Sequence, residues 1–195
     1  FEARRFCQMQ SLAPFVSLKD EKGADEVHKE IPKELYFSEE HLDIYDSFVG
    51  RDRYLWLYKD VCLPPARSGY DVIGLFDFGK TGEGTNKGFE SLLYVDGHPY
   101  QGVDTNHPDV IFNELSGKTV RLVFMLWTGL EGGGKPRQLR HLFRRADIGY
   151  LHKQTDELYY YARAAVETLE LLSQDDPAYS DIVIAMDLML SIIDW

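Results

Sequence analysis

Residues 90–104 read ESLLYVDGHPYQGVD, and this stretch decides how the fold is interpreted. Its first six residues are rich in branched and aromatic side chains, which are typical of β-strands. Asp96-Gly97 follows, the dipeptide favoured in the two-residue type I′ turn because both of its central positions need a positive φ. The chain then runs back toward Asp104, so we predict an antiparallel β-hairpin.

Three other segments carry the same kind of composition. They lie at residues 54–63, 71–78 and 119–127. Pro64-Pro65 ends the first of them, as expected at the end of a strand. Short strands at close spacing, with glycine and proline between them, favour a β-sandwich or jelly roll. Up to about Glu40 the sequence is charged, and we expect irregular structure there.

The apolar period changes after the glycine-rich run at 129–134. Steps of three and four residues then predict one long amphipathic helix over residues 147–172. Its apolar positions are Ile148, Leu151, Leu158, Ala162, Ala165, Leu169 and Leu172. Asp176 is placed to cap a second helix, with Pro177 at its first position and Ile182, Met186, Met189 and Ile193 on one face. The expected organisation is a sandwich at 1–145 and a helical hairpin at 146–195.

Bulk composition limits the classes of function. With 195 residues the chain can bury a core without disulfides, and Cys7 and Cys62 show no zinc-site spacing, so a reducing, cytoplasmic setting is expected. No apolar run is long enough for a signal peptide or a membrane span, and the absence of a first Met suggests a piece of a longer protein. The net charge of -11 argues against nucleic acid as a partner, so the basic stretch at 135–145 is interpreted as a solvated or partner-facing loop.

The densest polar cluster lies at residues 94–109. It contains His98, Asp104 and His107, which are possible metal ligands, but no helical spacing and no cysteine supports a metal site. A turn-rich loop is the simpler interpretation. No nucleophile motif of the Gly-x-Ser-x-Gly kind occurs, so we predict neither catalytic nor metal residues in this chain.

A carbohydrate platform is the other chemistry that this composition allows, because sugars stack on exposed aromatic rings. The rings considered are Trp56, Tyr94, Tyr100 and Trp127, of which Trp56 and Trp127 are expected in the core. The candidates for ligand binding or for lining a cleft are Tyr100, Gln101, Asp104, Asn106 and His107.

Several of these segments carry a family likeness. YLWLYK at 54–59, LFDFG at 75–79 and residues 90–104 together resemble the N-terminal domain of bacterial family-38 α-mannosidases, and VDGHPYQG at 95–102 is the most specific element. Residues 146–151 and the helical tail through Trp195 are similar to the segment that precedes the catalytic domain in that family.

The resemblance implies that the sandwich is galactose-binding-domain-like. It also implies a parent enzyme, a retaining glycoside hydrolase that removes terminal α-linked mannose with an Asp nucleophile and a zinc ion. Both belong to the catalytic domain, whose metal motif is absent here, so no residue of this chain inherits either role. The expectation is a non-catalytic N-terminal module whose partner is the catalytic domain of the same polypeptide, with a homo-oligomer also compatible. The alternative is a stand-alone carbohydrate-binding module for a mannoside.

Overall fold

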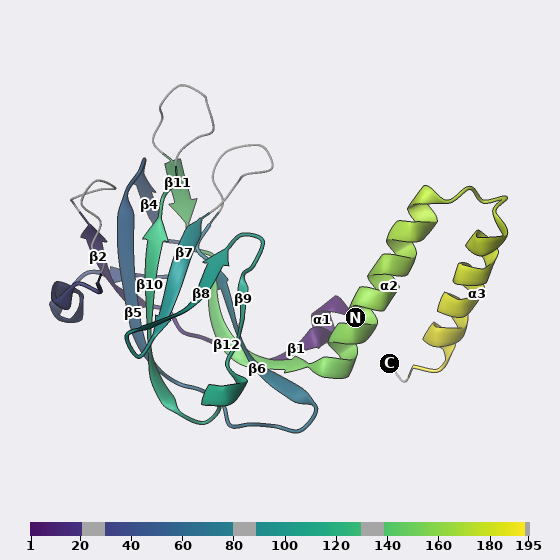
Figure 1. Cartoon of the computed structure of the whole chain (residues 1–195), viewed down its shortest axis with the longest axis horizontal. Coiled ribbons are helices and arrows are strands. Elements are labelled where there is room, and N and C mark those ends of the chain that lie inside the picture. The colour runs from purple at the N-terminus through teal and green to yellow at the C-terminus, as the bar shows by residue number, and fades with distance from the viewer. Residues whose placement is uncertain (21–29, 80–88, 130–138, 194–195) are drawn as a thin grey trace. The chain divides into compact units, whose positions relative to one another are not determined.

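The structure is a computed structural model that describes residues 1–20, 30–79, 89–129 and 139–193. The chain divides into two compact units. The larger unit is Gln8–Tyr150, and the smaller one combines Phe1–Cys7 with Leu151–Trp195. Figure 1 shows that the larger unit consists of β-sheets and the smaller one mainly of helices.

The larger unit is a β-sandwich, as the sequence predicted. One sheet has six strands in the order β3-β2-β5-β10-β7-β8, and the other has four in the order β1-β12-β6-β9. The bounds in the six-stranded sheet are β3 His41–Leu42, β2 Phe15–Asp20, β5 Tyr54–Cys62, β10 Thr119–Trp127, β7 Glu90–Val95 and β8 His98–Asp104. Those in the four-stranded sheet are β1 Phe6–Ser11, β12 Arg145–His152, β6 Tyr70–Asp77 and β9 Asp109–Ile111. Two short strands, β4 Ser47–Gly50 and β11 Leu139–Leu142, pair separately.

Aromatic rings fill the space between the two large sheets. The ring centroid of Phe124, on β10, lies 4.7 Å from that of Phe76, on β6, and 5.0 Å from that of Phe78, which directly follows β6. All three side chains are fully buried. Burial of this kind is the main contribution that holds two sheets face to face.

A second apolar cluster covers the opposite face of the six-stranded sheet. Trp56, Tyr94 and Val123 form it together with Leu35, which comes from the 3-10 helix η2 at Lys33–Phe37. A shorter 3-10 helix, η3, spans Asn113–Leu115. The six-stranded sheet is therefore apolar on both faces, and its middle strands read as nearly continuous apolar runs.

The hairpin prediction is confirmed. β7 and β8 pair antiparallel with Val95 opposite His98, and the turn between them has φ of 50° at Asp96 and 83° at Gly97. Positive φ at both central residues is the type I′ requirement. The strands expected at 54–63, 71–78 and 119–127 are present as β5, β6 and β10.

The expectation of irregular structure up to Glu40 was wrong. This segment forms β1, β2 and η2, and β2 pairs with β5 over Val16–Asp20. Phe15 and Ser17 are buried while Val16 and Leu18 are half-buried, so apolar residues occupy both faces of β2. Alternation is hidden in a strand that packs on both sides, which explains the error.

The first helix was also predicted to begin too early. Residues 145–152 form β12, and helix α2 spans Lys153–Leu171. Ala146 and Ile148 are buried while Arg145 and Asp147 are half-buried, which is the period of a strand, and residues 149–151 are then all buried. Ile148 and Leu151 are three residues apart, so they imitate a helical stripe in sequence.

The smaller unit holds a short helix α1 (Glu2–Arg5), α2 and a second long helix α3 (Pro177–Ser191), and α2 and α3 run antiparallel (Figure 1). Asp176 caps α3 by accepting a hydrogen bond from the Ala178 backbone N–H, with Pro177 next, as predicted. Arg5 forms an ion pair of 2.6 Å with Asp156, which ties the first residues to α2. Among the residues that the structure describes, no helix combines the length and apolarity needed to cross a bilayer.

Candidate functional site

The candidate residues lie where the two sheets of the sandwich meet at one edge. β8 is the last strand of the six-stranded sheet, and β9 is the last strand of the four-stranded sheet. The turn at residues 104–109 connects them directly. Each edge strand presents backbone groups that its own sheet does not pair, and proteins usually cover such groups.

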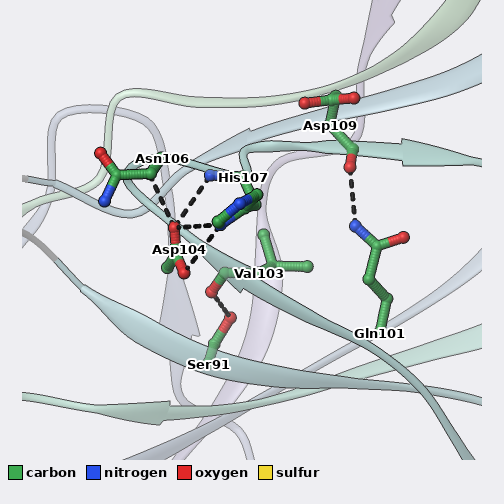
Figure 2. Close-up of polar contacts among 7 residues, drawn as sticks. All are labelled: Ser91, Gln101, Val103, Asp104, Asn106, His107 and Asp109. Atoms are coloured by element: carbon green, nitrogen blue, oxygen red, sulfur yellow. Dashed lines mark hydrogen bonds and ion pairs between the residues drawn. The ribbon is translucent and has the colours of Figure 1, made fainter.

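Asp104 organises this turn (Figure 2). Its Oδ1 atom accepts hydrogen bonds from the backbone N–H groups of Asn106, at 2.7 Å, and His107, at 2.8 Å. The Nδ1 atom of His107 lies 3.2 Å from both carboxylate oxygens. A carboxylate that accepts backbone N–H groups two and three residues ahead closes an Asx-type turn, so Asp104 has a structural task.

The charge of Asp104 is favoured by the same contacts. Burial by itself would raise the pKa of this carboxyl group, but the hydrogen bonds from the His107 ring and from the two backbone N–H groups outweigh burial and lower its pKa. The Asp104 side chain is 38% exposed and that of His107 74% exposed. Asp104 is therefore an ionised turn-former and is poorly suited to act as a proton donor near neutral pH.

Tyr100 and Gln101 join the two edge strands. Gln101 Nε2 donates to the backbone oxygen of Asp109 at 2.8 Å (Figure 2), and the Tyr100 hydroxyl donates to that of Ile111 at 2.8 Å. Both acceptors lie on β9. The side chains of Tyr100 and Gln101 therefore connect β8 to β9, and the side chain of Asp104 closes the turn between these strands.

The Tyr100 ring also packs against a buried aromatic ring on one of its faces. It stacks on the fully buried Phe112 with ring centroids 5.7 Å apart and an angle of 20° between the planes. Tyr100 remains 41% exposed, so part of its ring is open to solvent. Burial, with the nearby Glu114 carboxylate, raises the pKa of its hydroxyl group, which stays neutral and keeps donating to Ile111.

The remaining candidates face solvent. Asn106 and His107 are both exposed residues. Asn106 contributes its backbone N–H to Asp104, and its side-chain amide extends from the turn. Of the five candidates, Asn106, His107 and the open part of the Tyr100 ring are thus the groups best placed to contact a ligand.

The metal trio considered from the sequence is not assembled. His98 begins β8 and Asp104 ends it, so the two lie about 20 Å apart at the usual rise of a strand. Asp104 and His107 do meet. Within the described ranges, no group of three or more His, Cys, Asp or Glu side chains is arranged to hold a metal ion.

The other aromatic candidates belong to the sandwich. Trp56 is fully buried, as expected, and Tyr94 is 8% exposed. Trp127 is half-buried, and its Nε1 donates to Asp52 at 2.9 Å across a loop contact. Tyr100, at 41%, is the most exposed of the four rings considered.

One polar cluster was missed in the sequence. Arg121 of β10 donates from Nε to Asp60 Oδ1 at 2.8 Å and from Nη2 to Asp60 Oδ2 at 3.1 Å. Its guanidinium carbon lies 4.8 Å from the ring centroid of Tyr36 and 5.0 Å from that of Tyr58. Arg121 and Asp60 are directly opposite in the β10–β5 register, which the sequence alone does not provide.

Arg121 and Asp60 form an ion pair at the centre of this cluster. The hydrogen bonds from Arg121 lower the pKa of Asp60, and those to Asp60 raise the pKa of Arg121. The Tyr58 hydroxyl donates to Asp60 Oδ2 at 2.9 Å, and this bond raises the pKa of Tyr58. Groups that hold their charge so firmly do not exchange protons near neutral pH, so the cluster stabilises the sheet surface.

No family model and no curated protein matches the chain. The fold defines a mainly β protein, a sandwich followed by a helical pair. Its candidate site is an ordered edge between two sheets with a partly open aromatic ring beside two exposed polar side chains.

Proposed function

We propose that this chain is the non-catalytic N-terminal module of an α-mannosidase, in which a separate catalytic domain of the same polypeptide removes terminal α-linked mannose. Zinc and the nucleophile belong to that domain. The free Cys7 and Cys62 fit a reducing, cytoplasmic setting. A homo-oligomer of the whole enzyme is compatible with this proposal.

One observation carries the proposal. The element that resembles the mannosidase family most specifically, residues 95–102, has definite structural tasks in this sandwich. It supplies the type I′ turn at Asp96-Gly97 and the contacts of Tyr100 and Gln101 with β9. A motif used to close a sandwich suits a bracing module, since its polar groups are already engaged within the protein.

The test compares two polypeptides with an aryl α-mannoside as substrate. A longer polypeptide that joins this chain to the sequence following it in the parent gene should hydrolyse the substrate when loaded with zinc. The present chain should not. Failure of the zinc-loaded longer polypeptide would remove the mannosidase assignment.

A stand-alone carbohydrate-binding module is the second candidate, and the Tyr100 ring favours it. A ring backed by Phe112 and 41% exposed, next to exposed Asn106 and His107, offers a stacking surface with polar neighbours. Titration of the isolated chain with methyl α-mannoside distinguishes the candidates. Saturable binding that is lost in an Asn106→Ala/His107→Ala variant would favour the binding module, whereas the bracing module predicts no heat of binding.

A further inference from the structure

Helix α3 is apolar on two opposite sides. Ile182, Met186 and Met189 are half-buried on the first side, and they are three of the four residues that the sequence placed on one face. Ile184 and Leu188 lie two positions beyond Ile182 and Met186, and two residues turn an α-helix by about 200°. They therefore lie on the side away from the half-buried stripe.

This outward side forms a continuous stripe. Ile184, Leu188 and Ile192 follow one another at four-residue steps, the last of them at the C-cap of the helix. They are 65%, 64% and 78% exposed. A helix that is apolar all round is typically buried on all sides, and a row of large exposed aliphatic side chains is typical of an interaction surface. We call these three residues the outer stripe.

The charges around the outer stripe have one sign. Asp181 and Asp187 are the only charged residues of α3. The last basic residue in the whole sequence is Arg163, and every charged residue after it is acidic. Glu170 extends this acidic character along α2, whereas Glu167 is paired with Arg163 at 2.7 Å.

This charge pattern selects among possible occupants. A second copy of α3 would bring the same two acidic residues, Asp181 and Asp187, to this surface, and α3 has no basic residue to pair with them. Like charges in such positions disfavour association. An anionic membrane surface is disfavoured for the same reason. A segment with an apolar stripe bordered by Lys or Arg would cover the aliphatic side chains of the outer stripe and would also pair with the acidic residues beside it.

We propose that the outer stripe of α3 is a docking site for an amphipathic helical segment of a partner protein, with aliphatic side chains on one face and Lys or Arg residues along its borders. The aliphatic side chains pack on Ile184, Leu188 and Ile192, and the basic residues pair with Asp181 and Asp187. This inference stands independently of the mannosidase proposal.

The test uses the whole chain and two synthetic probes. One is a fluorescent eighteen-residue peptide of Leu and Lys with an amphipathic helical pattern, and the other has Glu at every Lys position. The Lys peptide should bind and the Glu peptide should bind at least tenfold more weakly. Ile184→Ser/Leu188→Ser should weaken binding of the Lys peptide at least tenfold, whereas the matched control Phe37→Ser/Val49→Ser, which changes exposed apolar residues of the sandwich, should not.

An Asp-to-Asn variant and hydrogen exchange test the charge contacts and the location of binding separately. Asp181→Asn/Asp187→Asn should weaken the Lys peptide and flatten the salt dependence of its binding, and hydrogen exchange should show protection of amides 180–192 when the peptide is added. Equal affinity of the Lys peptide for wild type and for Ile184→Ser/Leu188→Ser, with no protection of α3, would overturn the proposal. So would a wild-type dimer in sedimentation, or adsorption to phosphatidylcholine vesicles, that Ile184→Ser/Leu188→Ser abolishes.

Discussion

The Asp104 carboxylate lies 2.7 Å from the backbone nitrogen of Asn106, so the residue singled out as a ligand contact is the acceptor that closes its own turn. Asp104→Ala removes this acceptor and the bond from His107, and should lower the free energy of unfolding by about 1 to 2 kcal/mol. The melting temperature should fall by roughly 2 to 4 °C for each kcal/mol in a protein of this size. Asp104→Asn is the matched control, because its amide oxygen still accepts the backbone N–H groups. If Asp104→Ala melts like wild type, the turn does not depend on this carboxylate.

Gly97→Val should destabilise the sandwich by about 1 to 3 kcal/mol, because a β-branched residue resists the φ of 83° at this position. An added Cβ would find no atom within 4 Å, so the penalty is assigned to backbone strain and not to a clash of that atom. Gly102→Ala on β8 provides the control, since that glycine has no positive φ and its Cβ would lie 4.0 Å from the Ser91 oxygen. Chemical denaturation measures both variants. A Gly97→Val loss no larger than that of Gly102→Ala would contradict the strain argument.

His141 should make the sandwich sensitive to mild acid. The residue is fully buried, stacks on Phe48 with centroids 4.8 Å apart, and has Nε2 3.0 Å from the Thr128 oxygen. Burial lowers its pKa from the model-peptide value of 6.5, against the opposing effect of backbone groups of Thr128 and Gly79.

The direction of this pH effect on stability follows from the lowered pKa of His141. Below pH 6.5 the unfolded chain takes up a proton at His141 before the folded chain does, so stability falls with pH until the folded pKa is passed. Melting temperatures of wild type and His141→Phe between pH 8 and pH 5 test this. The wild type should lose more stability on acidification than the variant, and parallel curves would rule out His141 as the source.

Arg121→Lys should cost about 0.5 to 1.5 kcal/mol, although the charge is kept. The ammonium group of Lys cannot reproduce the planar pair of N–H bonds that the guanidinium makes with the two Asp60 oxygens, nor its contacts with the rings of Tyr36 and Tyr58. Asp60→Asn on the same pair completes a double-mutant cycle. A coupling energy near zero would mean that the pair is screened by solvent and contributes only its packing.

Much of the sandwich could be predicted from the sequence, because β5, β6, β7 and β10 each combine high β propensity with clear turn residues at their ends. Asp96-Gly97 fixed one register, and Asp176-Pro177 marked the start of α3. The strands β2 and β12 were missed for physical reasons: β2 is apolar on both faces, and β12 runs into α2 with no breaker between them. Periodicity fails in both situations.

The sequence predicted which residues belong to the candidate site, but it did not predict how their side chains are arranged. Tyr100, Gln101, Asp104, Asn106 and His107 do lie on one edge of the sandwich. What sequence could not show is that β8 and β9 end two different sheets, so the Gln101 amide and the Tyr100 hydroxyl are engaged by β9 carbonyls. The Arg121–Asp60 pair is likewise visible only once the strand register is known.

Asn106 is the cleanest probe of whether this edge lines a substrate cleft, because its exposed side chain can be removed without disturbing Asp104. In the longer polypeptide, Asn106→Ala should leave the melting temperature unchanged. If the edge lines the cleft, loss of one hydrogen bond to a sugar hydroxyl should lower kcat/KM by about five- to tenfold, or roughly 1 kcal/mol. Unchanged kcat/KM would assign the edge to bracing alone.

The most direct measurement of the central claim is aryl α-mannoside hydrolysis by purified protein, with the present chain and the longer polypeptide assayed side by side, each with added zinc and after chelation. The account predicts turnover that depends on zinc and belongs to the longer polypeptide alone. Activity that follows the present chain through purification and scales with its concentration would contradict the account, as would a folded, zinc-loaded longer polypeptide that leaves the substrate intact.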